Sequence, residues 1–168
     1  LSRSTKDIAL FTETLIHTKA RIRYCEQCFH ISYEKRCNIC QDPNRDPTLL
    51  CVIAEPQDVL AIEKAKIYKG HYLVLGGLLS PIDGIHPETL RIQELMQRIK
   101  SGSYQEILFA INPTIEGDTT ILYLSELLES TGIPLTKLAY GLPMGGNIDY
   151  ADELTLQKAV SGRIGVEH

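Results

Sequence analysis

The chain contains 168 residues, of which 43% are hydrophobic and 23% charged, and its 17 basic and 21 acidic residues give a net charge of −4. This mixture is typical of a globular chain and excludes a largely disordered one. No stretch approaches the roughly 18 apolar residues needed to span a bilayer, and the first residues contain no apolar signal region. We therefore expect a soluble, cytoplasmic protein with one α/β domain and a small appendage, or two small domains at most.

Charge is distributed unevenly along the chain. Residues 1–40 hold seven basic and four acidic residues, a net charge of +3, which leaves −7 for the remainder. Basic clusters attract phosphate backbones, so a nucleic-acid contact is expected in this segment. The alternative is a solvated surface without a partner. Ile8, Phe11 and Leu15 follow a helical spacing and predict one amphipathic helix at the start of the chain.

Four cysteines follow in two C-x-x-C pairs separated by eight residues: Cys25, Cys28, Cys37 and Cys40. Each pair can form a tight turn that brings two thiolates to one metal, and four thiolates complete a closed, tetrahedral zinc site. Two disulfides or free thiols are the alternatives, although disulfides are uncommon in cytoplasmic proteins. Residues 25–41 are therefore predicted to form a small four-cysteine zinc finger. Cys51 lies in an apolar run and is expected to be a buried core thiol.

Short apolar runs alternate with helical patterns beyond a turn-rich linker at residues 42–47. The predicted strands are residues 49–54, 72–75, 106–111 and 135–140. The predicted helices are residues 56–67, 87–99 and 119–129. A continuous apolar run such as 49–54 is typical of a strand that is buried on both faces. The alternation predicts the α/β fold class, with a parallel sheet covered by helices.

Four carboxylates follow two of the predicted strands: Glu55 and Asp58 after the first, Glu116 and Asp118 after the third. In open α/β sheets ligands gather beyond the carboxyl ends of the strands, and oxygen ligands of this kind suit Mg²⁺. A magnesium site is one interpretation. The other is that these carboxylates occupy the first turns of helices, where negative charge is favourable. The spacing supports both interpretations equally.

Four segments together resemble the RecR family of bacterial recombination mediators. They are the cysteine pairs, residues 78–87 (LLSPIDGIHP), residues 112–118 (NPTIEGD) and residues 141–147 (GLPMGGN) with their continuation to Arg163. They occur in the family's order over almost the whole chain. The resemblance implies a Toprim domain at residues 48–130, preceded by a helical segment at residues 1–24 and the zinc finger. It also implies a C-terminal segment, residues 131–168, with a Walker-B-like stretch.

The resemblance also implies a function in DNA repair and recombination. RecR-like proteins form homo-oligomers, ring-shaped tetramers able to encircle DNA, and act with RecO and RecF to load RecA onto single-stranded DNA. A dimer is the alternative assembly for this chain, and the family's N-terminal helix-hairpin-helix module would precede Leu1. The candidate phosphate contacts, which would be independent of base sequence, are Lys19, Arg21, Arg23, Lys35 and Arg36.

The acidic positions depart from the pattern of catalytic Toprim enzymes. Alignment to the family places Ala54 where the Toprim glutamate usually stands, and Asn112 and Thr114 where topoisomerases have an Asp-x-Asp pair. Glu55 is one position late, and a one-residue shift reverses the face of a strand. We therefore expect structural Zn²⁺ rather than catalytic Mg²⁺, and no enzyme activity. A Mg²⁺-dependent nuclease or primase-like enzyme and a purely structural assembly module are the rival interpretations.

Overall fold

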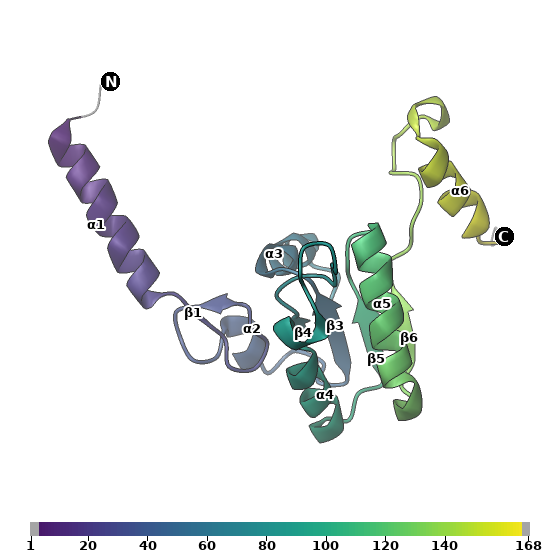
Figure 1. Cartoon of the computed structure of the whole chain (residues 1–168), viewed down its shortest axis with the longest axis horizontal. Helices are drawn as coiled ribbons and strands as arrows, with labels where there is room; N and C mark the ends of the chain where they lie inside the picture. Colours follow the sequence, from purple (N-terminus) through teal and green to yellow (C-terminus); the bar gives the residue numbers. More distant parts are fainter. Residues whose placement is uncertain (1–3, 166–168) are drawn as a thin grey trace.

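The described part of the chain, residues 4–165 of a computed structural model, forms a long helix, a cysteine-containing hairpin, a helix-flanked sheet and a C-terminal helix in chain order (Figure 1). The residues at the two ends, including Arg3 of the basic segment, lie outside the described residues. The α-helices are α1 (Thr5–Arg21), α2 (Asn38–Gln41), α3 (Pro56–Ala65), α4 (Ile92–Ser101), α5 (Ile115–Leu128) and α6 (Glu153–Ser161). The strands are β1 (Arg23–Tyr24), β2 (Ile31–Ser32), β3 (Leu49–Ile53), β4 (His71–Val74), β5 (Glu106–Phe109) and β6 (Leu135–Lys137). Single 3-10 turns are η1 (Pro87–Thr89), η2 (Glu129–Thr131) and η3 (Ile148–Tyr150).

A four-stranded parallel sheet in the order β4-β3-β5-β6 forms the centre of the molecule. β3 pairs with β4 on one side and β5 on the other, so that Val52 lies opposite both Leu73 and Phe109. This interior position explains the unbroken apolar sequence of β3, because both faces of the strand are covered. The predicted parallel sheet flanked by helices is confirmed.

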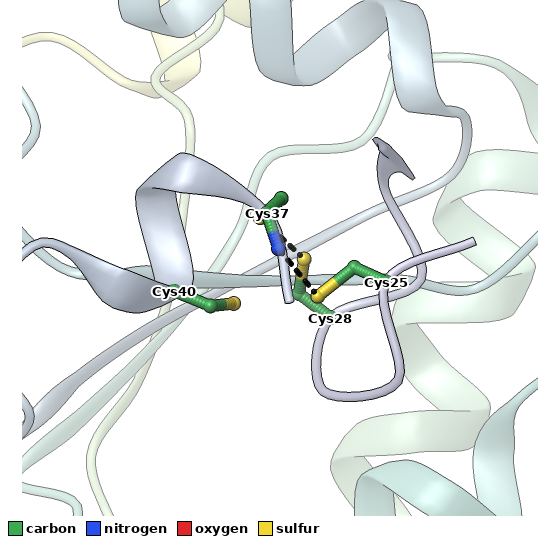
Figure 2. Close-up of side chains that lie close together, drawn as sticks. All are labelled: Cys25, Cys28, Cys37 and Cys40. Carbon is green, nitrogen blue, oxygen red and sulfur yellow. Dashed lines mark hydrogen bonds between the residues drawn. The ribbon is translucent and has the colours of Figure 1, made fainter. Parts of the chain in front are cut away.

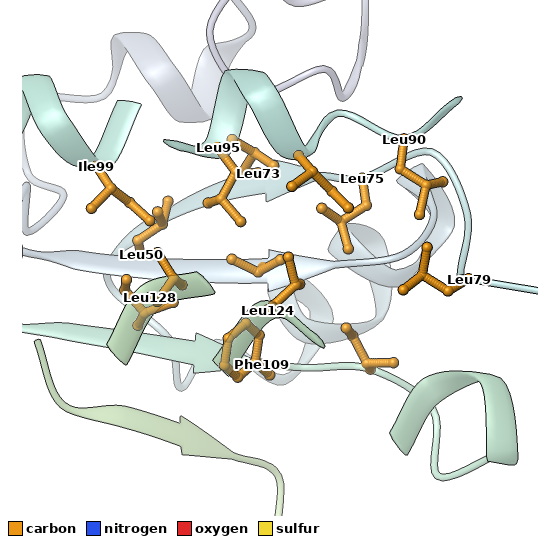
Figure 3. Close-up of a cluster of buried hydrophobic side chains, with 14 residues drawn as sticks. Leu50, Leu73, Leu75, Leu79, Leu90, Leu95, Ile99, Phe109, Leu124 and Leu128 are labelled. Atoms are coloured by element: carbon orange, nitrogen blue, oxygen red, sulfur yellow. The ribbon is translucent and has the colours of Figure 1, made fainter. Parts of the chain in front are cut away.

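Helices pack on both faces of this sheet. On one face, α4 and α5 cover the larger apolar cluster, whose strand residues include Leu50, Leu73 and Phe109 (Figure 3). On the other face, Val59 of α3 packs with a smaller cluster that includes Cys51. Cys51 is fully buried, as expected of a core thiol, and burial raises its pKa to about 12. The alternation of side chains along β3 thus supplies both clusters from one strand.

Two helices begin at residues other than those predicted. α4 begins at Ile92, because Pro87 starts the 3-10 turn η1 instead of the helix. α5 begins at Ile115, four residues before the predicted start, because the Thr114 side chain accepts a hydrogen bond from the Gly117 amide at 3.1 Å and caps the helix. Gly117 also lies so close to the Asn112 carbonyl that a Cβ atom would clash there. A glycine near the start of α5 therefore reflects close packing and does not interrupt the helix.

The helix α1 projects away from the sheet and has no buried residue (Figure 1). Its N-terminus is closed by a reciprocal cap between Ser4 and Asp7, each side chain bonding the other's backbone amide at 3.2 Å. The predicted apolar stripe is present, but Ile8, Phe11 and Leu15 are all exposed. Of the helices in residues 4–165, none combines the length and apolar character needed to cross a membrane.

The linker before the sheet is fastened to it by a partly buried ion pair. Nη1 of Arg45 donates to Oε1 of Glu63 on α3 at 2.8 Å and to the Gly70 carbonyl at 3.2 Å. Nη2 donates to the other carboxylate oxygen of Glu63. The Tyr72 hydroxyl donates to the same carboxylate at 2.6 Å. The Arg45 hydrogen bonds, together with that from Tyr72, hold the pKa of Glu63 below its usual range. The turn-rich linker therefore has a defined place on the sheet.

Replacing Glu63 with Gln should lower the free energy of unfolding by about 2 kcal/mol at neutral pH, because charge-assisted hydrogen bonds to Arg45 are lost. Because the folded-state pKa of Glu63 is lowered, its contribution to the free energy of unfolding is fully present at pH values above the unfolded-state pKa of 4.5. The contribution is lost as the pH falls through the lower, folded-state pKa. Urea unfolding of both chains should show a difference that shrinks in acid. Glu126→Gln on the exposed side of α5 is the control, and a difference that does not change with pH would contradict the assignment.

Candidate metal centre and nucleic-acid interface

Residues 25–41 are called the clip from here on. Their four cysteines converge on one point (Figure 2). All four are buried, and their sulfur atoms lie within 4.8 Å of one another. The Sγ atoms of Cys28 and Cys37 are 3.5 Å apart, too far for a disulfide, and all four cysteines are free. This arrangement matches the closed tetrahedral sulfur sites that proteins build for a metal ion.

Local structure explains how two short pairs reach the same point. β1 and β2 form an antiparallel hairpin, and between them the Phe29 amide donates to the Cys25 carbonyl at 2.9 Å. This tight turn, the first knuckle (residues 25–29), requires a left-handed backbone at Phe29, with φ of 62°. The second pair lies at the start of α2, where Cys37 is the N-cap residue. The Cys37 amide donates to Cys25 Sγ at 3.3 Å and ties the two pairs together.

Crowding of the sulfur atoms separates their acidities. Hydrogen bonds from the neighbouring thiols, chiefly that of Cys28, push the pKa of Cys37 far below its usual value. The pKa of Cys28 is raised, because its hydrogen bonds to Cys37 and Cys40 and its burial favour the protonated thiol. Without a cation the clip therefore tolerates few negative charges at once. A soft divalent ion would bind all four as thiolates, and tetrahedral sulfur ligation is diagnostic of zinc or iron.

Three of the five predicted phosphate contacts are exposed where α1 joins the clip. Lys19 and Arg21 lie in the last turn of α1, and Arg23 lies in β1. Arg21 also stacks over the Tyr33 ring, with 5.6 Å between the guanidinium carbon and the ring centroid. Within residues 4–165 none of these three side chains forms an ion pair. They are therefore available to a phosphate backbone.

The other two predicted contacts are engaged within the clip. Lys35 lies 3.9 Å from the Glu26 carboxylate. Arg36 donates from Nη2 to the side chain of Gln27 at 2.7 Å and to the Cys40 carbonyl at 2.8 Å. The Arg36 guanidinium therefore joins the two cysteine pairs, a structural contact that its place in the sequence did not suggest.

The four candidate carboxylates occupy two separate helix starts. Glu55 is the N-cap of α3, and the Asp58 side chain accepts from the Glu55 amide at 3.0 Å in a reciprocal cap. Glu116 and Asp118 lie in the first turn of α5. Within residues 4–165 the clip cysteines are the sole group of three or more potential metal ligands that come together. All four carboxylates thus lie at the start or in the first turn of a helix, the placement that the second interpretation describes.

Asp118 belongs to a polar cluster that sequence analysis did not identify. The Tyr140 hydroxyl donates to its carboxylate at 3.1 Å, and the Nζ atoms of Lys137 and Lys158 lie 3.8 and 3.6 Å away. Lys158 is on α6, so this cluster fastens the C-terminal segment to the sheet. The partners are distant in sequence, and no local pattern could have revealed them.

Comparisons with known proteins agree with this architecture. Residues 48–139 match the family model described as the Toprim domain, and residues 141–164 match the model described as the C-terminal part of RecR. The recombination protein RecR of Synechococcus elongatus is 49% identical over 163 residues, which cover 97% of this chain and 81% of the relative. Those of Acidothermus cellulolyticus and Streptomyces coelicolor are 47% and 45% identical, over 97% and 94% of this chain and 82% and 79% of the relatives. Similarity of this extent, on a helix-flanked parallel sheet that follows a four-cysteine clip, shows that the chain belongs to the RecR family and contains a Toprim domain.

Proposed function

We propose that the protein is a non-enzymatic DNA-binding mediator of recombinational repair, in which a structural zinc ion holds the clip and a basic surface contacts phosphates. The observation that supports this most directly is the position of Lys19, Arg21 and Arg23. They are exposed, lie together at the junction of α1 with the clip, and lack acidic partners within the described residues. Contacts of this kind attract any phosphate backbone without selecting a base sequence.

We further propose the family's partners and assembly for this chain. RecO and RecF would bind it during the loading of RecA onto single-stranded DNA, and the acidic remainder of the chain, at −7, suits protein partners better than DNA. The exposed stripe Ile8, Phe11 and Leu15 supports a homo-oligomer, because an isolated helix of this length is marginally stable in water. The functional segments would be residues 1–24, 25–41, 48–130 and 131–168.

The donor set supports zinc in the clip. Four buried thiolates with tetrahedral sulfur ligation leave no open position, which is the arrangement of structural zinc sites. Zinc in such small sites contributes an apparent ~10–16 kcal/mol, more than this short hairpin could gain from apolar packing alone. When bound, the ion would fix the two cysteine pairs relative to each other and so set the direction of α1.

Replacing Cys37 with Ser should abolish stoichiometric zinc binding and unfold the clip, because three thiolates and a hydroxyl cannot complete the site. Metal content of the purified full chain, measured by elemental analysis, checks this directly. Cys51→Ser is the matched control, because Cys51 is buried in the sheet and apart from the clip, and it should retain one zinc per chain. A Cys37→Ser chain with full zinc content would disprove the site.

Reversing two of the exposed charges, Arg21→Glu with Arg23→Glu, should weaken DNA binding and flatten its salt dependence. Each lost phosphate contact lowers the slope of log affinity against log salt by about one, so the double variant should lose about two. A salt titration with single-stranded and double-stranded DNA measures both effects. Lys64→Glu with Lys100→Glu, both exposed on helices of the sheet, is the charge-matched control. An unchanged slope in the Arg variant, or an equal loss in the control, would reject the assignment.

The absence of catalysis is also a proposal, and it rests on the carboxylates that remain. Glu55 and Asp58 are committed to capping α3, and Asp118 to its tyrosine and lysine partners. Incubation of the chain with DNA and Mg²⁺ should therefore yield no cleaved or joined product. A product that disappears in a Glu116→Gln variant would favour the rival Toprim enzyme.

A further inference from the structure

The clip is docked on the open edge of the Toprim sheet. β4 is an end strand, so the backbone groups on its outer side have no strand partner. The Val74 amide donates instead to the carbonyl of Cys28 at 2.9 Å, whereas the next amide, Leu75, points inward to Ile53 of β3 at 2.9 Å. A metal-ligating residue thus provides a backbone partner for the sheet edge.

Each cysteine pair also sends one apolar side chain into the sheet core. Phe29, which follows the first pair, packs against both hydrophobic clusters, and Ile39, within the second pair, packs against the smaller one. The left-handed backbone of Phe29, with φ of 62°, is strained for a bulky residue. Arg91, the N-cap residue of α4, lies over its ring, 4.1 Å from the centroid. The metal-bound turn is therefore the conformation that directs the Phe29 ring into its place.

Arg98 of α4 joins the clip to the edge strand directly. Its Nη1 donates to the carbonyl of Gln27 in the first knuckle at 3.0 Å and to the carbonyl of Tyr72 in β4 at 2.7 Å. Its Nε donates to the Tyr104 hydroxyl at 2.9 Å. The remaining nitrogen, Nη2, is buried and has no hydrogen-bond partner among the described residues. The guanidinium is thus held by neutral acceptors at the junction of the two parts.

The positive charge of Arg98 has no carboxylate partner within residues 4–165. The two acidic residues that line the neighbouring groove with it pair elsewhere: Glu26 with Lys35 and Glu94 with Arg91, both at 3.9 Å. Arg98 is only partly buried, but its buried Nη2 atom leaves a donor unsatisfied, which costs free energy. A zinc ion with four thiolates has a net charge of minus two, and such a centre in the adjacent clip would compensate the guanidinium.

We propose that Arg98 is a positioning residue that couples metal loading of the clip to docking of the clip on the Toprim sheet. This inference depends on the zinc site proposed above. Arg98 bridges two backbone carbonyls, one in the metal-binding turn and one in the sheet edge, and its charge complements the thiolate centre. Zinc binding and the integrity of the β4 edge are therefore linked, so that weakening either one weakens the other.

The test is zinc release from the loaded full chain after addition of a chelator with a chromogenic zinc indicator. Arg98→Met keeps the apolar stem of the side chain but removes the charge and the donors, and should release zinc about 10- to 100-fold faster, the usual effect of losing an outer partner of a metal site. Arg98→Lys keeps the charge without the fork and should fall between. Lys100→Met, exposed two residues along the same helix, should match the unmodified chain.

Amide hydrogen exchange provides a second readout that needs no variant. In the unmodified chain, removing zinc should accelerate exchange at Val74 at least tenfold more than at Leu75, because only the Val74 amide is bonded to the clip. Zinc release at the unmodified rate in both Arg98 variants, or equal acceleration at the two amides, would overturn the coupling. A native chain that contains no stoichiometric zinc would instead remove the proposed metal site, and the coupling with it.

Discussion

The docking of the clip on the outer edge of β4, through the hydrogen bond from the Val74 amide to the Cys28 carbonyl and the packing of Phe29 and Ile39, determines how the N-terminal part of the molecule meets the sheet. This docking meets two structural requirements, one of the hairpin and one of the sheet. A four-cysteine hairpin cannot bury enough apolar surface to fold alone, and a parallel sheet with an open end strand exposes unpaired backbone groups. Docking the hairpin on that edge solves both problems with one interface. The clip is thus a structural part of the Toprim sheet, although it precedes the sheet in sequence.

The same docking affects which basic side chains of the clip and of α1 remain free of contacts. The inner side of the clip faces the sheet through Phe29 and Ile39, and Arg36 is used to join the two cysteine pairs. At the junction of α1 with the clip, Lys19, Arg21 and Arg23 are exposed and form no ion pair among the described residues. The carboxylates of the sheet lie elsewhere, at the starts of α3 and α5. In the proposed function, a phosphate backbone would therefore approach the α1 end of the molecule rather than the starts of α3 and α5.

The parts of the fold that follow from short-range patterns could be predicted from the sequence. The apolar run of β3, the proline at the start of α3 and the spacing of the cysteines each act within a few residues. The start of α5 was missed because a threonine cap and a closely packed glycine resemble a loop until the Asn112 carbonyl is placed beside them. The place of Pro87 in a separate 3-10 turn depends likewise on how the chain enters α4.

Side-chain roles that depend on tertiary contacts could not be predicted from the sequence. Arg36 resembles any surface cation until the Cys40 carbonyl lies against it, and the cluster around Asp118 joins three segments that no local pattern connects.

The geometry of the clip also limits how DNA can be recognised. Fingers that select bases insert a helix into the major groove, but α2 has only four residues, and one of them is the buried ligand Cys40. A single helical turn presents too few side chains to read a series of base edges. The unpaired cations Lys19, Arg21 and Arg23 belong to α1 and β1, which lead directly into the clip. In the proposed function the clip would orient a phosphate-binding surface, and selectivity for a DNA structure would come from how several such surfaces are arranged in the proposed assembly rather than from base contacts.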